Sequence, residues 1–555
     1  MSELVFQQLR QRCLSAVDKP LTNECFDSAI KLVLSKLPQL EKRLGRVGVA
    51  VSGGPDSLSV LAAAVHYFGR ERVTAISINH QLPGVNEEGT RISQLVSHFG
   101  VDFIQRNVDW PQNVPPITPK IQLQAREVRY QLMGEECRKK GIMLLLLGHC
   151  QDDDIGTTMY RMGKASGLDG LAGMKYLLPL PVMHPLAGRL DAKGELTGVF
   201  VGRPFLHVPK SQLVATCERV LGNAIYDPSN GSPQFLRNGI VSALRASGIE
   251  ATRLAHMVET FKKLRAFMTG QVSSLMRTSV VLDRINGTSM LFLNSPHLLQ
   301  PENKPPLMRT INALLQYSAA VHRPMKSLRL NQLYAQMQSA FEEHQWEAET
   351  KRQRLPRQFR NEDPTPGEQT KRIRAASFSL GGGIFYPLSR MHALKRLSLH
   401  NERHPNRAIQ FGPGFLIQSE FTRNTKITPP TLSPSDYIVY DKRVFLKPSM
   451  TLDTATRKWS VEPLGPDQIK MYQVCARMER SARIPLQALL ATTPMTHTFQ
   501  LPVIIAEDTQ TEEIVYMAIP TIGAQWTKDD TLRKLTWECV HMGECVLSAR
   551  FLCLS

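Results

Sequence analysis

The residues best suited to chemistry begin with the loop SGGPDS at residues 52–57. The loop follows a run with β-branched residues at alternate positions, Val47, Val49 and Val51, and precedes a nearly continuous apolar stretch. This pattern predicts a buried strand that enters a helix through a tight turn. Unpaired N–H groups and the helix dipole at such a turn favour an anion, so the loop is a candidate phosphate site.

The loop carries a carboxylate where the common phosphate-binding loop carries a lysine. Asp56 stands at the helix start, and no Gly-Lys-Ser/Thr sequence closes the loop. A carboxylate repels a polyphosphate unless a divalent cation lies between them, and Mg²⁺ is often held in this way. We therefore expect Asp56 to bind Mg²⁺, and the alternative is an ordinary turn capped by Ser52. The candidate phosphate-binding residues are Ser52, Gly53, Gly54, Pro55, Asp56 and Ser57.

A second polar cluster, HCQDDD, follows the predicted strand IMLLLLGH at residues 142–149. His149 ends this strand, and Asp152, Asp153 and Asp154 come soon after it. Three adjacent carboxylates repel one another, so a packed core position is not expected for them. They form either a solvated loop or a site, and their place at the carboxyl end of a strand near SGGPDS favours a site.

Strands and helices alternate along this part of the chain. The predicted elements are strands at 73–79 and 101–108 and helices at 87–99 and 122–140, followed by a stretch from about 200 to 265 that reads as helical. The alternation predicts an α/β fold with a doubly wound parallel sheet, whose ligands lie at the switch in strand order. The loops after Val51, Ile78 and Leu147 are expected to meet at one crevice.

Composition bounds the class of protein. With 555 residues, of which 42% are hydrophobic, the chain can form two to four globular domains. The net charge of +18 predicts a polyanionic partner, with nucleic acid as the leading candidate and a basic surface without such a partner as the alternative. Nine scattered cysteines without a C-x-x-C pair fit a reducing compartment, and no apolar stretch predicts a membrane partner.

In chain order, several motifs together resemble the tRNA(Ile)-lysidine synthetases, which belong to the PP-loop or N-type ATP pyrophosphatase superfamily. The motifs are SGGPDS, HCQDDD, MGKASGLDGLAGM (162–174), RPFLHVPK (203–210), DPSN (227–230) and RNGI (237–240), with further support from IQLQAREVRY (121–130). The resemblance covers residues 46 to about 245. SGGPDS alone indicates only the superfamily. The lysidine branch is indicated by the series Gly167-Leu168, Gly170-Leu171 and Gly173-Met174 together with DPSN and RN.

The resemblance implies a two-step ligation that uses ATP and Mg²⁺. ATP adenylates the C2 carbonyl oxygen of the wobble cytidine in a CAU-anticodon tRNA(Ile), and the ε-amino group of free L-lysine then attacks C2 and expels AMP. The lysine must attack as a neutral amine, so a nearby base is required. The implied catalytic residues are His149, Asp152, Asp153, Asp154 and Arg237, with Asp153 facing the lysine and Arg237 stabilising phosphate charge.

The chain departs from the family pattern H-H-x-D-D-Q-x-E-T, which here reads HCQDDDIGT. Cys150 replaces the second histidine, Asp154 the glutamine and Gly156 the glutamate. The lost glutamate argues against full activity, and Asp154 is the candidate substitute. The alternatives are therefore a tRNA thiolase of the same superfamily, which would need reactive cysteines, and a catalytically impaired tRNA-binding homologue.

The expected organisation has five parts. They are an N-terminal helical segment (1–45), a PP-loop ATP pyrophosphatase domain (46–245), a helical tRNA-binding region (246–350), a basic linker (351–374) and a smaller α+β C-terminal domain (375–555). Strand-like runs near 378, 436 and 501 support the last part. The expected location is mitochondrial in a eukaryote, since the C-terminal half is atypical, or cytoplasmic in a bacterium. A homodimer is one of the states left open.

Overall fold

The computed structural model divides into two compact units, Met1–Gly270 with Ser548–Ser555, and Gln271–Leu547. The residues that the structure describes are 19–79, 88–108, 121–182, 184–190, 195–221, 250–283, 287–293, 296–319, 325, 330–339, 378–380, 383–387, 414–419, 427–429, 433–434, 437–440, 444–465, 467–469 and 501–541. The predicted basic linker lies outside these residues. None of the helices in the described part has the length and apolar character required to cross a bilayer.

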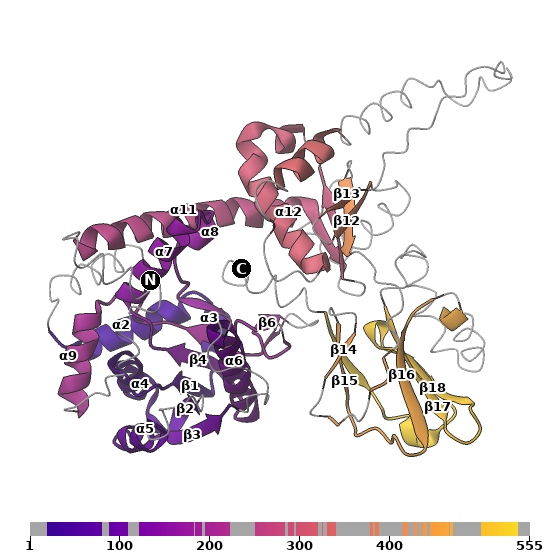
Figure 1. Ribbon diagram of the computed structural model, residues 1–555, viewed down its shortest axis with the longest axis horizontal. Coiled ribbons are helices and arrows are strands. Elements are labelled where there is room, and N and C mark those ends of the chain that lie inside the picture. Colours follow the sequence, from indigo (N-terminus) through magenta and orange to yellow (C-terminus); the bar gives the residue numbers. More distant parts are fainter. Residues whose placement is uncertain are drawn as a thin grey trace. The chain divides into compact units, whose positions relative to one another are not determined.

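The first unit is built on a six-stranded sheet in the order β3-β2-β1-β4-β8-β5 (Figure 1). The strands are β1 (Arg46–Ala50), β2 (Val73–Asn79), β3 (Asp102–Asn107), β4 (Ile142–Leu147), β5 (Leu177–Pro179) and β8 (Phe200–Gly202). All neighbours are parallel except β5 and β8. β2 lies on one side of β1 and β4 on the other, so the strand order switches between β1 and β4. The predicted doubly wound sheet is confirmed.

Helices cover this sheet as the alternating pattern predicts. They are α2 (Asn23–Leu34), α3 (Pro38–Glu41), α4 (Pro55–Phe68), α5 (Glu88–Ser97), α6 (Ile121–Lys139), α7 (Gln151–Gly163), α8 (Leu168–Leu171), α9 (Lys210–Leu221) and the start of α11 (Ala251–Ser279). α4 is buried over most of its length because it packs against both α2 and α9. Phe26 and Ile30 of α2 belong to the same core, so α2 is part of this unit's interior.

The prediction of helix throughout residues 200–265 is wrong at its beginning. Phe200–Gly202 forms β8, which pairs with β4 and β5 inside the sheet. Phe200 and Val201 are fully buried. A strand of three residues is too short to show an alternating pattern, whereas α9 and α11 later in the range have the expected helical length. A two-stranded ribbon of β6 (Arg189–Leu190) and β7 (Leu196–Thr197) precedes β8.

The described residues of the second unit form three antiparallel sheets. The first has the order β11-β12-β13-β10-β9, the second β14-β15-β20 and the third β16-β17-β18-β19. Their strands are β9 (Val280–Asp283), β10 (Thr288–Phe292), β11 (Phe378–Leu380), β12 (Gly383–Pro387), β13 (Gly414–Ser419), β14 (Ile438–Tyr440), β15 (Val444–Pro448), β16 (Arg457–Pro463), β17 (Pro502–Asp508), β18 (Ile514–Ile519), β19 (Ala524–Thr527) and β20 (Trp537–His541). The helix α12 (Lys304–Ala319) packs on the first sheet. The strand-like runs near 378, 436 and 501 are therefore confirmed, and the region 246–350 contains a hairpin, β9–β10, besides its helices.

Gly148 lets the end of β4 approach the first turn of α4. A Cβ atom at residue 148 would lie 2.6 Å from the backbone nitrogen of Ser57 and 2.7 Å from the carbonyl carbon of Asp56. Both atoms are main chain and cannot rotate away. Only a residue without a side chain fits here, and the close approach joins the two loops that the sequence singles out.

We expect Gly148→Ala to lower the free energy of unfolding by about 1–3 kcal/mol, the usual cost of forcing extra volume into a packed interior. Urea denaturation measures this change. Gly45→Ala is the matched control, because an added Cβ at residue 45 meets no atom within 4 Å, and a change within about 0.5 kcal/mol is expected for it. Equal stability of the two variants would contradict the packing constraint at Gly148.

Candidate active site

The SGGPDS loop is closed by the side chain of Ser57. Its Oγ donates a hydrogen bond to the carbonyl of Gly54 at 2.9 Å and accepts one from the N–H of Ser52 at 3.2 Å. Gly53 has a φ of 79°, a conformation that glycine adopts without steric cost. Gly54 is the N-cap of α4 and provides no side-chain cap. The first turn of the helix therefore presents N–H groups to an anion.

Asp56 lies in the first turn of α4 beside a lysine from α9. Lys210 Nζ is 3.2 Å from Asp56 Oδ2, and the Asp56 side chain is only 17% exposed. The other oxygen, Oδ1, is buried and has no hydrogen-bond partner among the described residues. Burial raises the pKa of Asp56 to about 6; Lys210 opposes this shift, while Asp153 and Asp152 add to it. A buried oxygen of this kind is suited to a divalent cation.

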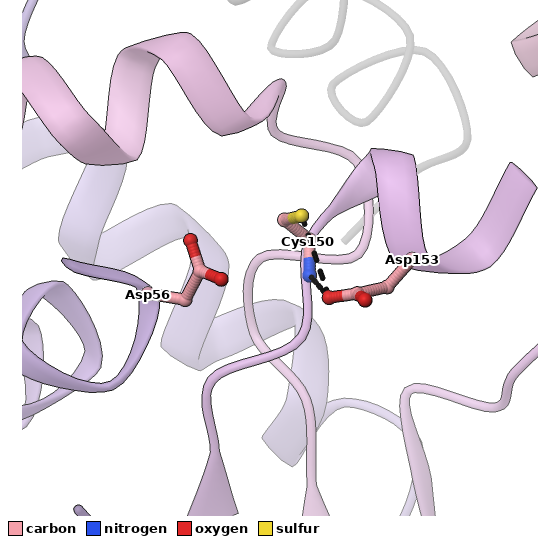
Figure 2. Close-up of side chains that lie close together, drawn as sticks. All are labelled: Asp56, Cys150 and Asp153. Carbon is pink, nitrogen blue, oxygen red and sulfur yellow. Dashed lines mark hydrogen bonds between the residues drawn. The ribbon is translucent and has the colours of Figure 1, made fainter. Parts of the chain in front are cut away.

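Asp56, Cys150 and Asp153 bring one ligand atom each to within 4.8 Å of one another (Figure 2). Cys150 is the N-cap of α7, and its N–H and its thiol both donate to Asp153 Oδ2, at 3.1 and 3.4 Å. Burial and then the charge of Asp153 raise the pKa of the Cys150 thiol well above its ordinary value. Carboxylates suit Mg²⁺, whereas a protonated thiol does not. Asp56, which has an oxygen without a hydrogen-bond partner among the described residues, therefore fits Mg²⁺, and Cys150 does not.

His149 is held by a buried arginine from the segment after β8. Arg203 Nε donates to His149 Nδ1 at 3.3 Å, and Arg203 Nη1 donates to the carbonyl of Lys175 at 3.1 Å. Because Nδ1 accepts a hydrogen bond, the neutral imidazole carries its proton on Nε2. Burial lowers the pKa of Arg203, but a guanidinium keeps its charge under all ordinary conditions. His149 is thus fixed as a hydrogen-bond donor through Nε2.

Asp152 ties the start of α7 to the start of α9. Its Oδ1 accepts a hydrogen bond from the backbone N–H of Lys210 at 3.2 Å, and the N–H of Gln151 donates to the carbonyl of Val208 at 2.9 Å. The first bond satisfies one of the free N–H groups at the beginning of α9. Asp152 therefore positions the residue whose ammonium group meets Asp56.

Asp154 has partners of a different kind from those of its neighbours. It is 2% exposed, its Oδ2 lies 2.6 Å from Lys262 Nζ of α11, and its Oδ1 accepts from the N–H of Met174 at 2.6 Å. Gly173, with a φ of 59°, lies against it, since a Cβ there would be 2.2 Å from Asp154 Oδ1. The sequence predicts a catalytic carboxylate at 154, but both oxygens bind groups that hold the fold together. We therefore assign Asp154 a positioning role.

Lys262 fastens α11 onto the end of α7. Besides its ion pair with Asp154, its Nζ lies 5.2 Å from the centroid of the Tyr176 ring. Farther along α7, Ile155 packs against Ala255 and Val258 of α11, and Figure 1 shows the two helices side by side. A cavity of about 20 Å³ adjoins the pair, room for about one water molecule. This side of α7 is a packing interface.

The resemblance implies an arginine at residue 237 and, in the family pattern, a glutamate where this chain has Gly156. Neither supplies a charged group to the described part of the site. Arg237, with the DPSN and RNGI motifs, lies outside the described residues, so its catalytic role stays a prediction. Gly156 is buried within α7 and has no side chain. Because Lys262 engages Asp154, Asp153 is the other carboxylate that the sequence analysis offers as a base.

Sequence reasoning missed three cations that the structure places at the site, two at carboxylates and one at a histidine. Lys210 meets Asp56, Arg203 meets His149 and Lys262 meets Asp154. Lys210 and Arg203 belong to the motif RPFLHVPK, which contributes to the resemblance. This motif could therefore have identified both residues as site residues. Lys262 follows no motif, and nothing in its local sequence distinguishes it from the neighbouring Lys263.

Comparison with known proteins identifies the domain type. Residues 26–246 match the model of the PP-loop domain. The chain is 31% identical over 226 residues to the tRNA(Ile)-lysidine synthase of Methylobacterium nodulans. This alignment covers 40% of this chain and 61% of that protein. It is 32% identical over 231 residues to that of Zymomonas mobilis, with the same two coverages. The chain thus spans about three fifths of the length of these curated relatives.

Among solved structures, the U34-tRNA thiolase NcsA from Methanococcus maripaludis, described with its [4Fe-4S] cluster, aligns with a TM-score of 0.30. The alignment has 18% sequence identity and covers 44% of this chain and 79% of that one. At this level of similarity the alignment supports no conclusion about the chemistry of the site.

Asp56→Asn is expected to stabilise the metal-free protein at pH 7. Because the pKa rises from 3.8 in a free side chain to about 6 in the fold, ionisation opposes folding by roughly 2–3 kcal/mol above pH 6, and this cost disappears below pH 3.8. Melting in EDTA should show a higher midpoint for the variant at pH 7 and a smaller difference at pH 5. Glu71→Gln, at an 87% exposed side chain, is the control without an effect. A lower midpoint for Asp56→Asn at pH 7 would contradict the assignment.

Lys262→Met is expected to lower the free energy of unfolding by about 3–5 kcal/mol, because it leaves the carboxylate of Asp154 buried without its cation. The double variant Lys262→Met/Asp154→Asn should recover most of this loss, since no buried charge remains and the amide oxygen can still accept from Met174. Lys263→Met is the matched control at the next, exposed residue. If the double variant were as unstable as Lys262→Met in urea, the ion pair would not be the cause.

Proposed function

We propose that this chain, in which residues 26–246 form a PP-loop domain, is an ATP-dependent carbon–nitrogen ligase that acts on tRNA. Its reaction would join free L-lysine to C2 of the wobble cytidine of a CAU-anticodon tRNA(Ile), as in the relatives named tRNA(Ile)-lysidine synthase. The observation that supports the proposal most is the meeting of two loops at the β1/β4 switch point, which brings Asp56 beside Cys150 and Asp153. A mitochondrial location and a homodimer stay predictions of the sequence.

The loop of residues 52–57 would hold the polyphosphate of ATP. Its helix-start N–H groups attract phosphate oxygens, and Lys210 adds a positive charge beside Asp56. Asp56 would hold Mg²⁺, which neutralises phosphate charge when bound. Lys210 is itself held by Asp152 through its backbone N–H. Together these residues align the α-phosphate of ATP with the carbonyl oxygen that attacks it.

The first step would activate a poor leaving group. The C2 carbonyl oxygen of cytidine attacks the α-phosphorus, the bond to the β-phosphate breaks, and pyrophosphate leaves. The C2 oxygen then belongs to AMP, a far better leaving group. His149 can donate its Nε2 proton in a hydrogen bond to the negative charge that develops on the phosphate, because Arg203 fixes Nδ1 as an acceptor. His149 acts here as a fixed donor and does not change its protonation state.

The second step would need a base for the lysine substrate. An ammonium group with a pKa of about 10.4 must lose a proton before its nitrogen can attack C2 and expel AMP. Asp153 is the candidate, since its Oδ2 is held in place by the N–H and thiol of Cys150. Asp154 is engaged by Lys262 and Gly156 offers no carboxylate. The lysine step would therefore depend on a single side chain.

The alternatives fit the site less well. A thiolase needs a reactive thiol, yet the Cys150 thiol is buried, has a raised pKa and donates to Asp153. The other four free cysteines among the described residues, Cys25, Cys137, Cys217 and Cys539, lie in or against hydrophobic clusters, and burial raises the pKa of Cys137 and Cys217. Gly156 is the one feature that favours a catalytically impaired tRNA-binding homologue. The experiment below distinguishes such a protein from an active enzyme.

The decisive experiment is mass spectrometry of the wobble nucleoside after incubation with tRNA(Ile), ATP, Mg²⁺ and isotope-labelled lysine. We expect a cytidine derivative that carries the label, with pyrophosphate released in a tRNA-dependent reaction and AMP released when lysine is added. A thiolase would release pyrophosphate without regard to lysine. A binding protein would bind the tRNA and release nothing, and either result would overturn the proposal.

Asp153→Asn tests the base. An amide oxygen can still accept from the Cys150 N–H, so the cap of α7 is kept while the charge is lost. We expect single-turnover lysine incorporation to fall by about 10²–10⁴-fold, the usual contribution of a general base, with tRNA-dependent pyrophosphate release retained. Asp169→Asn, at an exposed residue of α8, should leave both readouts unchanged. Undiminished lysine incorporation by Asp153→Asn would exclude Asp153 as the base.

A further inference from the structure

The helix α11 exposes a basic and aromatic surface next to the site. Lys263, Leu264 and Phe267, called here the α11 patch, are all exposed. Phe267 is 65% and Leu264 48% exposed, and Phe267 is the most exposed large apolar side chain among the described residues. Phenylalanine is normally buried. The packing of α11 against α7 uses Ala255 and Val258 on another face, so this contact does not require an aromatic ring at 267.

The charge around the patch has one sign. Between residues 251 and 279, α11 contains five lysines and arginines and a single acidic residue, Glu259. Glu259 lines the small cavity beside Lys262, so no carboxylate of this helix belongs to the exposed patch. Lys263 and Phe267 are four residues apart and therefore share one side of the helix. An anionic partner with flat apolar groups would complement both.

The patch is fixed relative to the site by two bonds of the same helix. Lys262 pairs with Asp154 at 2.6 Å, and Arg265 Nη1 donates to the carbonyl of Gly173 at 3.3 Å. Asp154 directly follows Asp153 at the start of α7. Phe267 lies five residues beyond Lys262, which is about 7.5 Å along a helix axis. Lys262 and Phe267 also point about 140° apart around the helix, so an RNA loop would have to pass around α11 to contact both the patch and a site at Asp153.

We propose that the α11 patch binds the single-stranded anticodon loop of the tRNA, with a base stacked on the Phe267 ring and a phosphate beside Lys263. This inference rests on the proposed function, because that function supplies the RNA. Exposed aromatic rings next to cations bind unpaired nucleotides with little sequence preference, since every base offers a flat face. The excess of 67 basic over 49 acidic residues in the chain favours the same polyanionic partner.

Affinity measurements with tRNA(Ile) and with its anticodon stem-loop test the patch. Phe267→Ala should weaken binding by about 5- to 100-fold, the range for removal of a base-stacking ring, and Phe267→Trp should retain it. Lys263→Gln should reduce the dependence of log affinity on log salt by about one unit, whereas Phe267→Ala should leave that slope unchanged. Val220→Ala is the matched control at a 40% exposed apolar residue of α9, and no change is expected for it.

Fluorescence gives a direct readout of stacking. The anticodon stem-loop should quench the added indole in Phe267→Trp and should leave Val220→Trp unaffected, while both proteins contain the same five native tryptophans. If wild type forms lysidine but Phe267→Ala binds RNA as tightly as wild type does, the α11 patch is wrong and the proposed function stands. If wild type forms no lysidine, weaker binding of oligouridylate by Phe267→Ala still supports the patch. A lower melting temperature of Phe267→Ala with unchanged RNA affinity would mean that the ring packs within the protein, which also overturns the inference.

Discussion

Where β4 ends, its backbone passes so close to the first turn of α4 that residue 148 has no room for a side chain. β1 and β4 are parallel neighbours in the sheet and lie at the switch in strand order. The segments that follow them therefore begin next to each other at the same edge of the sheet. The contact at Gly148 shortens the remaining distance. It brings Asp56, from the loop after β1, within 4.8 Å of the ligand atoms that Cys150 and Asp153 supply after β4.

The three consecutive carboxylates of α7 avoid one another because the helix turns them toward different partners. Successive residues of an α-helix point about 100° apart. Asp152 accepts from the first N–H of α9, Asp153 from the N-cap Cys150, and Asp154 from Met174 while it pairs with Lys262. Each carboxylate therefore anchors a different segment at the site. The mutual repulsion that the sequence predicts is offset by bonds to groups distant in sequence for Asp152 and Asp154 and by the N-cap of the same helix for Asp153.

Elements with a long periodic pattern were predictable, and short or partner-dependent features were not. The strand Val73–Asn79 has the predicted bounds, and the helix Ile121–Lys139 ends before Gly141, whose φ of 66° suits a helix terminus. β8 has only three residues, too few to show a period. In the site, the loop of residues 52–57 could be recognised from the sequence because its residues are contiguous. The partner of Asp154 was not, since Lys262 lies 108 positions away and looks like any helical surface lysine.

The ion pair between Asp154 and Lys262 also sets the charge that a substrate meets. Asp56, Asp152, Asp153 and Asp154 are the carboxylates of the site, and Lys210, Arg203 and Lys262 are its cations. Lys210 stands on the side of the phosphate loop, where polyphosphate requires positive charge. Lys262 pairs with Asp154, whereas Asp153 accepts from the N–H and thiol of Cys150 and also acts on Lys210 through its charge. Asp153 therefore leaves negative charge near the start of α7, and in the proposed reaction this charge would meet the ammonium group of the lysine.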